Sequence, residues 1–274
     1  MSDQAPEEKV RGWLGLQGYP LEYEAARILR AEGFRAVQGW SYRVEDDGLV
    51  KAREIDILAS WDGTVSMSMD DRPPDLPARF SVAVECKYMT APWVVLTTAH
   101  PPEWRPLCSQ WMEQLLRAAH LSAAEWFELG PEVGFSVKTA AKGQDVAHEA
   151  LMQATNAASA AALRSSAQAG RQRPEWALPV VVVRGSLFTL GYDDAGAEAL
   201  RQVRWCRLVW HGADSVDEPT LVDVVTRDHW ETYVRQLGET ARGITGRIDE
   251  HRANEKAGWL RKMAEQQAAR EAQP

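Results

Sequence analysis

Cysteine, long apolar runs and basic charge are all scarce in this chain of 274 residues. The three cysteines, Cys86, Cys108 and Cys206, lie far apart and show no metal-ligand spacing. A reduced, cytoplasmic setting is therefore the simplest expectation. No apolar run approaches the roughly 20 residues that span a bilayer. Residues 1–9 are polar and acidic, so we expect neither a secretory signal nor contact with a membrane.

The net charge of −8 excludes a protein that coats DNA through general basicity. Residues 1–100 carry 11 basic and 16 acidic side chains, a net charge of 11 − 16 = −5. Any contact with nucleic acid would come from a local patch or a partner chain, and bound metal would neutralise part of the acidity. The chain shows no pattern of a helix-turn-helix or zinc finger, which disfavours a dedicated reader of DNA sequence.

Hydrophobic periodicity predicts an alternation of helices and strands. A first helix opens at Pro20 and stops at Gly33. Helices are expected at residues 104–129 and 144–168, and strands at 34–44, 50–60, 79–89 and 178–184, with weaker strand candidates at 203–210 and 221–225. The run 178–184 is apolar up to Arg184 at its end, which predicts burial on both faces, and residues 186–191 are a candidate hairpin partner for it.

Four charged residues stand in a fixed order along these elements. Glu22 opens the first helix, Asp56 lies in the second strand within Ile55-Asp56-Ile57, and Glu85 and Lys87 lie in the third. Side chains alternate along a strand, so Glu85 and Lys87 share one face. The same rule predicts that Ile55 and Ile57 face the core together. Hairpin-like pairing would then place Asp56 beside Glu85 on an open face.

Two neighbouring carboxylates repel each other and raise a pKa unless a cation lies between them. Oxygen ligands on a rigid sheet suit magnesium, which keeps several waters and takes one or two protein carboxylates. Such a metal would acidify a bound water. Lys87 would stabilise the hydroxide or the developing negative charge, and Glu22 could reach the same cleft from its helix.

This layout resembles the PD-(D/E)xK superfamily, the restriction-endonuclease-like nucleases, although Ile55 replaces the proline of the motif. The resemblance implies an α/β fold with a three-layer core, a central mixed β-sheet flanked by helices, and helical additions. Residues 1–225 would form the nuclease-like domain, with a core at about 18–190, and residues 226–274 a charged C-terminal helical extension.

The resemblance also implies a metal-dependent endonuclease that hydrolyses phosphodiester bonds, most often in DNA. Asp56, Glu85 and Glu22 would bind Mg²⁺, with Mn²⁺ as a substitute, and Lys87 would complete the catalytic set. Cleavage of both strands usually needs two active sites, so a homodimer or a partner protein is plausible.

Other interpretations remain open at this stage. The fold could serve as a catalytically inactive binding or scaffold module in a defence or repair complex, or the substrate could be RNA or a single strand. Glu22 could instead stabilise a helix N-terminus, and Glu24 could take its role. Glu54 is more simply explained as a surface residue paired with Arg53, and Cys86 as a packed core thiol.

Several further residues have a weaker connection to the cleft. Trp93 follows the third strand, where the chain would pass the cleft, although a core position is the simpler explanation. Gln153 could hydrogen-bond into the cleft or lie on a solvated helix face. Candidate phosphate contacts of low specificity are Lys138, Lys142, Arg164, Arg171 and Arg173.

Overall fold

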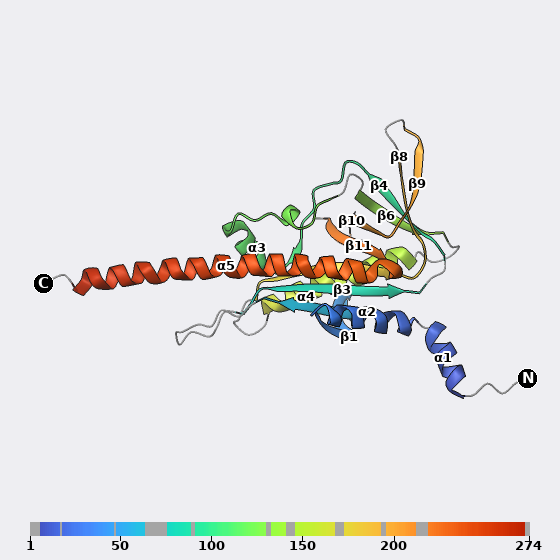
Figure 1. The fold of residues 1–274 in the computed structure, drawn as a ribbon, viewed down its shortest axis with the longest axis horizontal. Coiled ribbons are helices and arrows are strands. Elements are labelled where there is room, and N and C mark those ends of the chain that lie inside the picture. Colours follow the sequence, from blue (N-terminus) through green and yellow to red (C-terminus); the bar gives the residue numbers. More distant parts are fainter. Residues whose placement is uncertain are drawn as a thin grey trace, which may run out of the picture.

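The computed structural model places helices on both faces of a large mixed β-sheet, so the protein has a mixed α/β fold (Figure 1). The structure describes residues 6–16, 18–46, 48–63, 76–88, 91–129, 133–140, 146–167, 173–192, 196–211 and 219–271. Lys142 and Arg171, two of the candidate phosphate contacts, lie outside these residues.

The described residues form one sheet of eleven strands. The strands are β1 (Arg35–Asp46), β2 (Leu49–Asp62), β3 (Arg79–Lys87), β4 (Trp93–Thr98), β5 (Leu107–Cys108), β6 (Val133–Thr139), β7 (Glu175–Val183), β8 (Leu187–Tyr192), β9 (Glu198–Val203), β10 (Trp205–Trp210) and β11 (Thr220–Thr226). Their order is β1-β2-β3-β7-β11-β10-β6-β4-β8-β9, and β5 pairs with β7. Strands β1, β2 and β3 are antiparallel, whereas β3, β7 and β11 run parallel.

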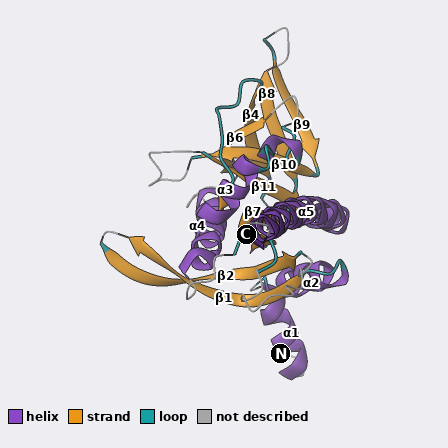
Figure 2. Ribbon diagram, turned by 90° about the vertical axis from the view of Figure 1, so that its left-hand side faces the viewer, coloured by secondary structure: helices purple, strands orange, loops and turns teal. Residues whose placement is uncertain are grey.

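The helices form a layer on each face of the sheet. They are α1 (Pro6–Leu16), α2 (Tyr19–Ala31), α3 (Gln110–Ala118), α4 (Val146–Ala167) and α5 (Trp230–Glu271), with short 3-10 turns at Ala123–Glu125 and Arg227–His229. Figure 2 shows α4 on one side of the sheet and α2 and α5 on the other. Core residues of α2, α3 and α5 belong to one hydrophobic cluster, and those of α4 to two clusters on the opposite face.

The composition of the two long helices explains how they pack. Helix α4 presents alanines to the sheet, among them Ala150, Ala154 and Ala157, which are fully buried. Alanine favours helix formation and has no side chain beyond Cβ, so the helix lies close to the strands. Helix α5 is buried along its first half, from Trp230 to Ile248, and then projects beyond the body of the molecule (Figure 1).

The predicted elements that position the candidate site are confirmed. Helix α2 carries Pro20 in its first turn, and Gly33 follows its end with a φ of +91°, a conformation that favours glycine. The three predicted strands correspond to β1, β2 and β3, and the helix predicted at 144–168 to α4. All nine residues of β7 are buried, which confirms the predicted burial of residues 178–183, whereas Arg184 follows the strand and is exposed.

The prediction of a single helix at residues 104–129 is wrong. Ser109 caps α3 by accepting a hydrogen bond from the Met112 amide, and Ser122 caps a separate 3-10 turn. Such caps start new helices, so the segment breaks into pieces. The candidate hairpin at 186–191 is also wrong, because β8 pairs with β4 and β9 rather than with β7. Strands β4, β6 and β9 and helix α1 were not predicted.

Candidate active site

Glu22 lies in the first turn of α2, where its backbone amide hydrogen-bonds to Gly18. Gly18 has a φ of +87°, and a Cβ built on it would lie 3.7 Å from the Tyr88 Cβ and 4.0 Å from Glu22 Oε1. Tyr88 directly follows Lys87 at the end of β3. The start of α2 therefore brings the Glu22 carboxylate to the carboxyl end of β3.

Asp56 and Glu85 meet where β2 and β3 separate. The antiparallel pairing puts Ile57 opposite Val84, so Asp56 and Glu85 are the next pair along. Asp56 Oδ2 accepts a hydrogen bond of 2.6 Å from the Cys86 amide. A side-chain carboxylate thus takes the place of a strand-to-strand backbone hydrogen bond, and it fixes Asp56 against β3.

Strand β2 is irregular at Asp56, which corrects the predicted alternation. Ile55 packs in the core cluster under α4, whereas Ile57 packs with α2 and α5. On a regular strand these two residues would share a face. The neighbouring β1 is also irregular, because Gly39, which lies opposite Asp56, has a φ of +64°. The prediction that Ile55 and Ile57 face one core together is therefore wrong.

Lys87 connects the acidic residues to α4. Its Nζ lies 2.6 Å from Glu85 Oε1 and donates a second hydrogen bond of 3.2 Å to Gln153 Oε1. The backbone carbonyl of Gln153 accepts a hydrogen bond of 3.2 Å from the Tyr42 hydroxyl. Of the two interpretations of Gln153, the structure supports contact with the cleft. Helix α4 covers this face, so it is less open than predicted: the Glu85 side chain is 5% exposed and that of Lys87 20%.

The three carboxylates act on one another through their charges. Burial and the charge of Asp56 raise the pKa of Glu85 from 4.5 to about 7, against the opposing effect of Lys87. Burial and the same aspartate raise the pKa of Glu22 to about 7. Burial also raises the pKa of Asp56, although the Cys86 amide and Lys87 oppose it. The predicted residues Glu22, Asp56, Glu85 and Lys87 are therefore brought together.

The cluster has an unmet requirement for positive charge. Glu85 Oε2 is buried and has no hydrogen-bond partner among the described residues. A buried polar atom without a partner costs free energy, and a carboxylate oxygen is a hard donor that suits a divalent cation. Within the described ranges no three His, Cys, Asp or Glu side chains form a ready metal centre. Magnesium fits such a site, since it takes one or two carboxylates and retains waters.

Two other acidic residues, Glu54 and Glu24, differ in how they relate to the cluster. Glu54 is exposed, and its charge raises the pKa of both Glu22 and Asp56, so it belongs to the edge of the cluster. Glu24 forms an ion pair with Arg227, 2.7 Å between Nε and Oε2, which places it outside the cluster.

The remaining candidates lie at some distance from the acids or beside them in the core. Cys86 packs against the cluster formed with α2 and α5, and burial raises the pKa of its thiol. Trp93 is fully buried in β4, in a core cluster with α4, and not in a loop. Lys138 lies on β6, and Arg173 forms an ion pair with Asp62.

A hollow of about 790 Å³ lies beyond the end of β3, where Tyr88, the residue after Lys87, lines it. Its lining includes Tyr88, Arg184 and Arg204. The Arg184 guanidinium lies 4.2 Å from the centre of the Tyr88 ring, and its backbone amide donates to the carbonyl of Lys87. Two arginines, Arg184 and Arg204, and one acid, Asp228, thus line open space beyond the end of β3.

The chain matches no protein-family model, no curated protein and no solved structure. Among the described residues no helix is both long and apolar enough to cross a membrane. The function is therefore inferred from the geometry of the site.

Proposed function

We propose that this protein is a metal-dependent nuclease that hydrolyses phosphodiester bonds, with DNA as the first substrate to test. The observation that carries the proposal is Glu85. Its buried carboxylate lies next to Asp56, contacts Lys87 through one oxygen and leaves the other without a partner among the described residues. A purely structural ion pair would be expected to satisfy both oxygens.

We further propose that the chain has a restriction-endonuclease-like core and belongs to the PD-(D/E)xK superfamily. The order of elements supports this: helix α2, three antiparallel strands, and then β7 parallel to β3 with α4 before it in the chain. The acids lie on the elements that the resemblance requires, with Asp56 on β2 and Glu85 and Lys87 on β3.

Each residue of the cluster has a role that follows from its position. Asp56 and Glu85 would hold the divalent cation, with Glu22 as a further ligand directly or through water. When bound, Mg²⁺ or Mn²⁺ supplies Lewis-acid chemistry, which lowers the pKa of water and neutralises charge on phosphoryl oxygens. The Lys87 ammonium stabilises negative charge that develops at the reacting phosphate, and Gln153 holds it in position.

A digestion panel tests the proposal. Linear, circular, single-stranded and branched DNA, together with RNA, are incubated with Mg²⁺, with Mn²⁺ and with a chelator. We expect cleavage of at least one DNA substrate with metal and none with the chelator, and the same loss in Asp56→Ala. Cleavage that persists in the chelator, or in Asp56→Ala, would contradict the mechanism.

The alternative is a catalytically inactive binding or scaffold module. The burial of Glu85 under α4 and the net charge of −8 favour it. Calorimetric titration with Mg²⁺ and Mn²⁺ separates the two candidates. A nuclease takes up one or more ions at millimolar concentration and loses that uptake in Glu85→Gln, whereas no uptake by the wild-type protein favours the module.

A further inference from the structure

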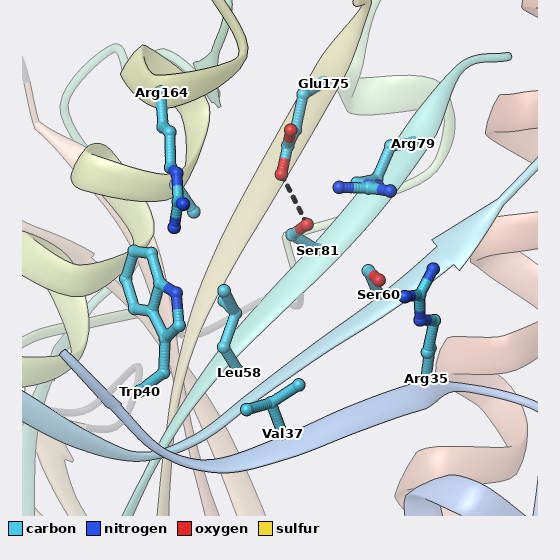
Figure 3. A pocket seen from close by; sticks show the side chains of 10 residues that line it. Arg35, Val37, Trp40, Leu58, Ser60, Arg79, Ser81, Arg164 and Glu175 are labelled. Atoms are coloured by element: carbon cyan, nitrogen blue, oxygen red, sulfur yellow. Dashed lines mark hydrogen bonds between the residues drawn. The ribbon is translucent and has the colours of Figure 1, made fainter. Parts of the chain in front are cut away.

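A second pocket, of about 260 Å³, opens on the α4 side of the sheet, between α4 and strands β1 to β3. Three arginines line it: Arg35 on β1, Arg79 on β3 and Arg164 on α4. We call these three residues and the space between them the arginine pocket. Figure 3 shows Arg164 pointing towards Trp40 on one side, with Arg35 and Arg79 on the other.

The arginine pocket carries more positive than negative charge. Arg79 and Arg173 both form ion pairs with Asp62, at 2.6 and 2.9 Å. The other acid is Glu175, which is buried and whose Oε1 accepts a hydrogen bond of 2.6 Å from Ser81. Asp62 and Glu175 thus offset two of the four arginine charges in and beside the pocket, those of Arg79 and of the neighbouring Arg173.

Arg35 and Arg164 account for the surplus of positive charge in the arginine pocket. Arg35 and Arg164 are exposed, and neither side chain has an ion-pair or hydrogen-bond partner in the described part of the chain. Burial alone would raise the pKa of Asp62, but the hydrogen bond and charge of Arg79 and the charges of Arg173 and Arg35 lower it. Asp62 already has two ion-pair partners, Arg79 and Arg173, so Arg35 and Arg164 remain available to an external anion.

The distance from the arginine pocket to the acidic cluster follows from two elements. Ser81 and Glu85 share one face of β3 and are four residues apart, which is about 13 Å along a strand. Gln153 and Arg164 are eleven residues apart on α4, about 16 Å and close to three whole turns, so they share a face of the helix. The pocket and the cluster therefore lie about 13–16 Å apart on one face of the sheet, with fully buried core residues such as Ala83 and Ala157 between them.

Of the two aromatic side chains near the pocket, Trp40 is half-buried and Tyr42 is buried in the core. Trp40 lines the arginine pocket and stacks on Tyr42, with ring centres 5.9 Å apart. Tyr42 in turn donates its hydroxyl to the Gln153 carbonyl beside Lys87. Arginine guanidinium groups bind phosphate in bidentate fashion, and aromatic rings stack on bases without regard to sequence.

We propose that the arginine pocket binds a backbone phosphate of a polynucleotide, several nucleotides away from the bond that is cut at Glu85 and Lys87. This inference rests on the proposed nuclease function and makes it more specific, because it assigns a polymeric substrate. The shared chemistry of the ligand is a phosphate group, which a free phosphate ion or a mononucleotide would also offer.

Binding without metal tests the pocket apart from catalysis. Fluorescence anisotropy of a labelled 12-nucleotide single-stranded DNA is measured in a chelator over a range of salt. The variant is Arg35→Ala/Arg164→Ala, and the control, Arg117→Ala/Arg261→Ala, removes two exposed arginines from α3 and the projecting part of α5. We expect the pocket variant to bind several-fold more weakly than the control.

The salt dependence adds a second readout. The slope of log K against log salt should fall by about 0.7 for each phosphate that the variant no longer neutralises, because fewer counterions are released. Arg35→Lys/Arg164→Lys, which keeps the charge, should retain most of the slope. A slope in the alanine variant equal to that of the control would overturn the inference. Loss of binding to inorganic phosphate, with oligonucleotide binding intact, would identify a free-phosphate site and also overturn it.

Cleavage with Mg²⁺ provides the length test. The pocket variant should show a raised KM for the 12-nucleotide strand and unchanged hydrolysis of bis(p-nitrophenyl) phosphate, which is too short to reach the pocket. An unchanged KM for the long substrate would contradict the inference even if cleavage occurs. If the wild-type protein cleaves neither substrate, the nuclease proposal fails, and the anisotropy result still decides whether the pocket binds polynucleotide.

Discussion

Replacing Glu85 with glutamine should stabilise the metal-free protein at alkaline pH. Burial and the charge of Asp56 raise the pKa of Glu85 in the folded state from 4.5 to about 7. The folded protein therefore holds a proton that the unfolded chain releases, and stability falls as pH rises from about 4.5 to about 7. One pH unit is worth about 1.4 kcal/mol, so this difference costs the wild type about 3 kcal/mol at pH 8.

Glutamine resembles the protonated acid and avoids this cost. In a chelator we expect Glu85→Gln to gain about 3 kcal/mol at pH 8 and only about 1 kcal/mol at pH 5. For a chain of this size the gain at pH 8 is about 6–12 °C in Tm. Urea and thermal unfolding at both pH values measure it, with Glu113→Gln on α3, an exposed partner of Arg117, as the control.

Magnesium should reverse the order of the two proteins. The wild type gains stability from bound ion at pH 8, whereas Glu85→Gln does not. The reasoning is refuted if Glu85→Gln is destabilised equally at pH 5 and pH 8, because the carboxylate would then act as a structural partner of Lys87 and not as an unsatisfied ligand.

Two further predictions concern the protonation of Glu85 and the buried ion pair between Arg207 and Asp223. Mn²⁺ affinity, measured by calorimetry, should rise about tenfold between pH 6 and pH 8 if Glu85 alone must lose a proton of pKa about 7, and a flat profile would exclude it as a ligand. Asp223→Ala should cost about 3–5 kcal/mol in urea unfolding, because it leaves the Arg207 guanidinium without its two 2.8 Å contacts and removes the acceptor of the Tyr233 hydroxyl. If Asp223→Ala lowers the free energy of unfolding by less than about 1 kcal/mol, water must reach Arg207. The double variant Arg207→Leu/Asp223→Leu should destabilise the protein far less than Asp223→Ala, because it leaves no buried charge without a partner.

The sequence was sufficient to locate the acidic cluster because its pattern is local. Glu85 and Lys87 share a face by simple strand alternation, and the apolar residues between and before them place the strand in the core. Pro20 fixes the start of α2 and hence the position of Glu22. Each of these inferences needs only a few neighbouring residues.

Features that depend on distant contacts could not be predicted. The irregularity at Asp56 involves Gly39 on another strand. The sequence leaves two interpretations of Gln153 open, because its contact with Lys87 joins residues 66 positions apart. The arginine pocket joins Arg35 and Arg164, which no local pattern relates. Likewise β4 and β8 pair across a long stretch of chain, so their neighbouring residues do not reveal the partner.

The breakup of the helix predicted at residues 104–129 has a different cause. Helical periodicity continues past Ser109 and Ser122, but the hydroxyls of these residues bond to backbone amides and begin new elements. Serine side chains compete with the helix in this way, so propensity alone overestimates the length of the helix.

The most direct test of the account is metal-dependent cleavage by Lys87→Ala. Lys87 lies 2.6 Å from Glu85 Oε1, and its ammonium is expected to stabilise the charge that develops on the phosphate. We predict that initial rates with Mg²⁺ fall by about 10²-fold or more while circular dichroism shows an intact fold, with Lys262→Ala on the projecting part of α5 at the wild-type rate. An unchanged rate in Lys87→Ala would contradict the proposed active site.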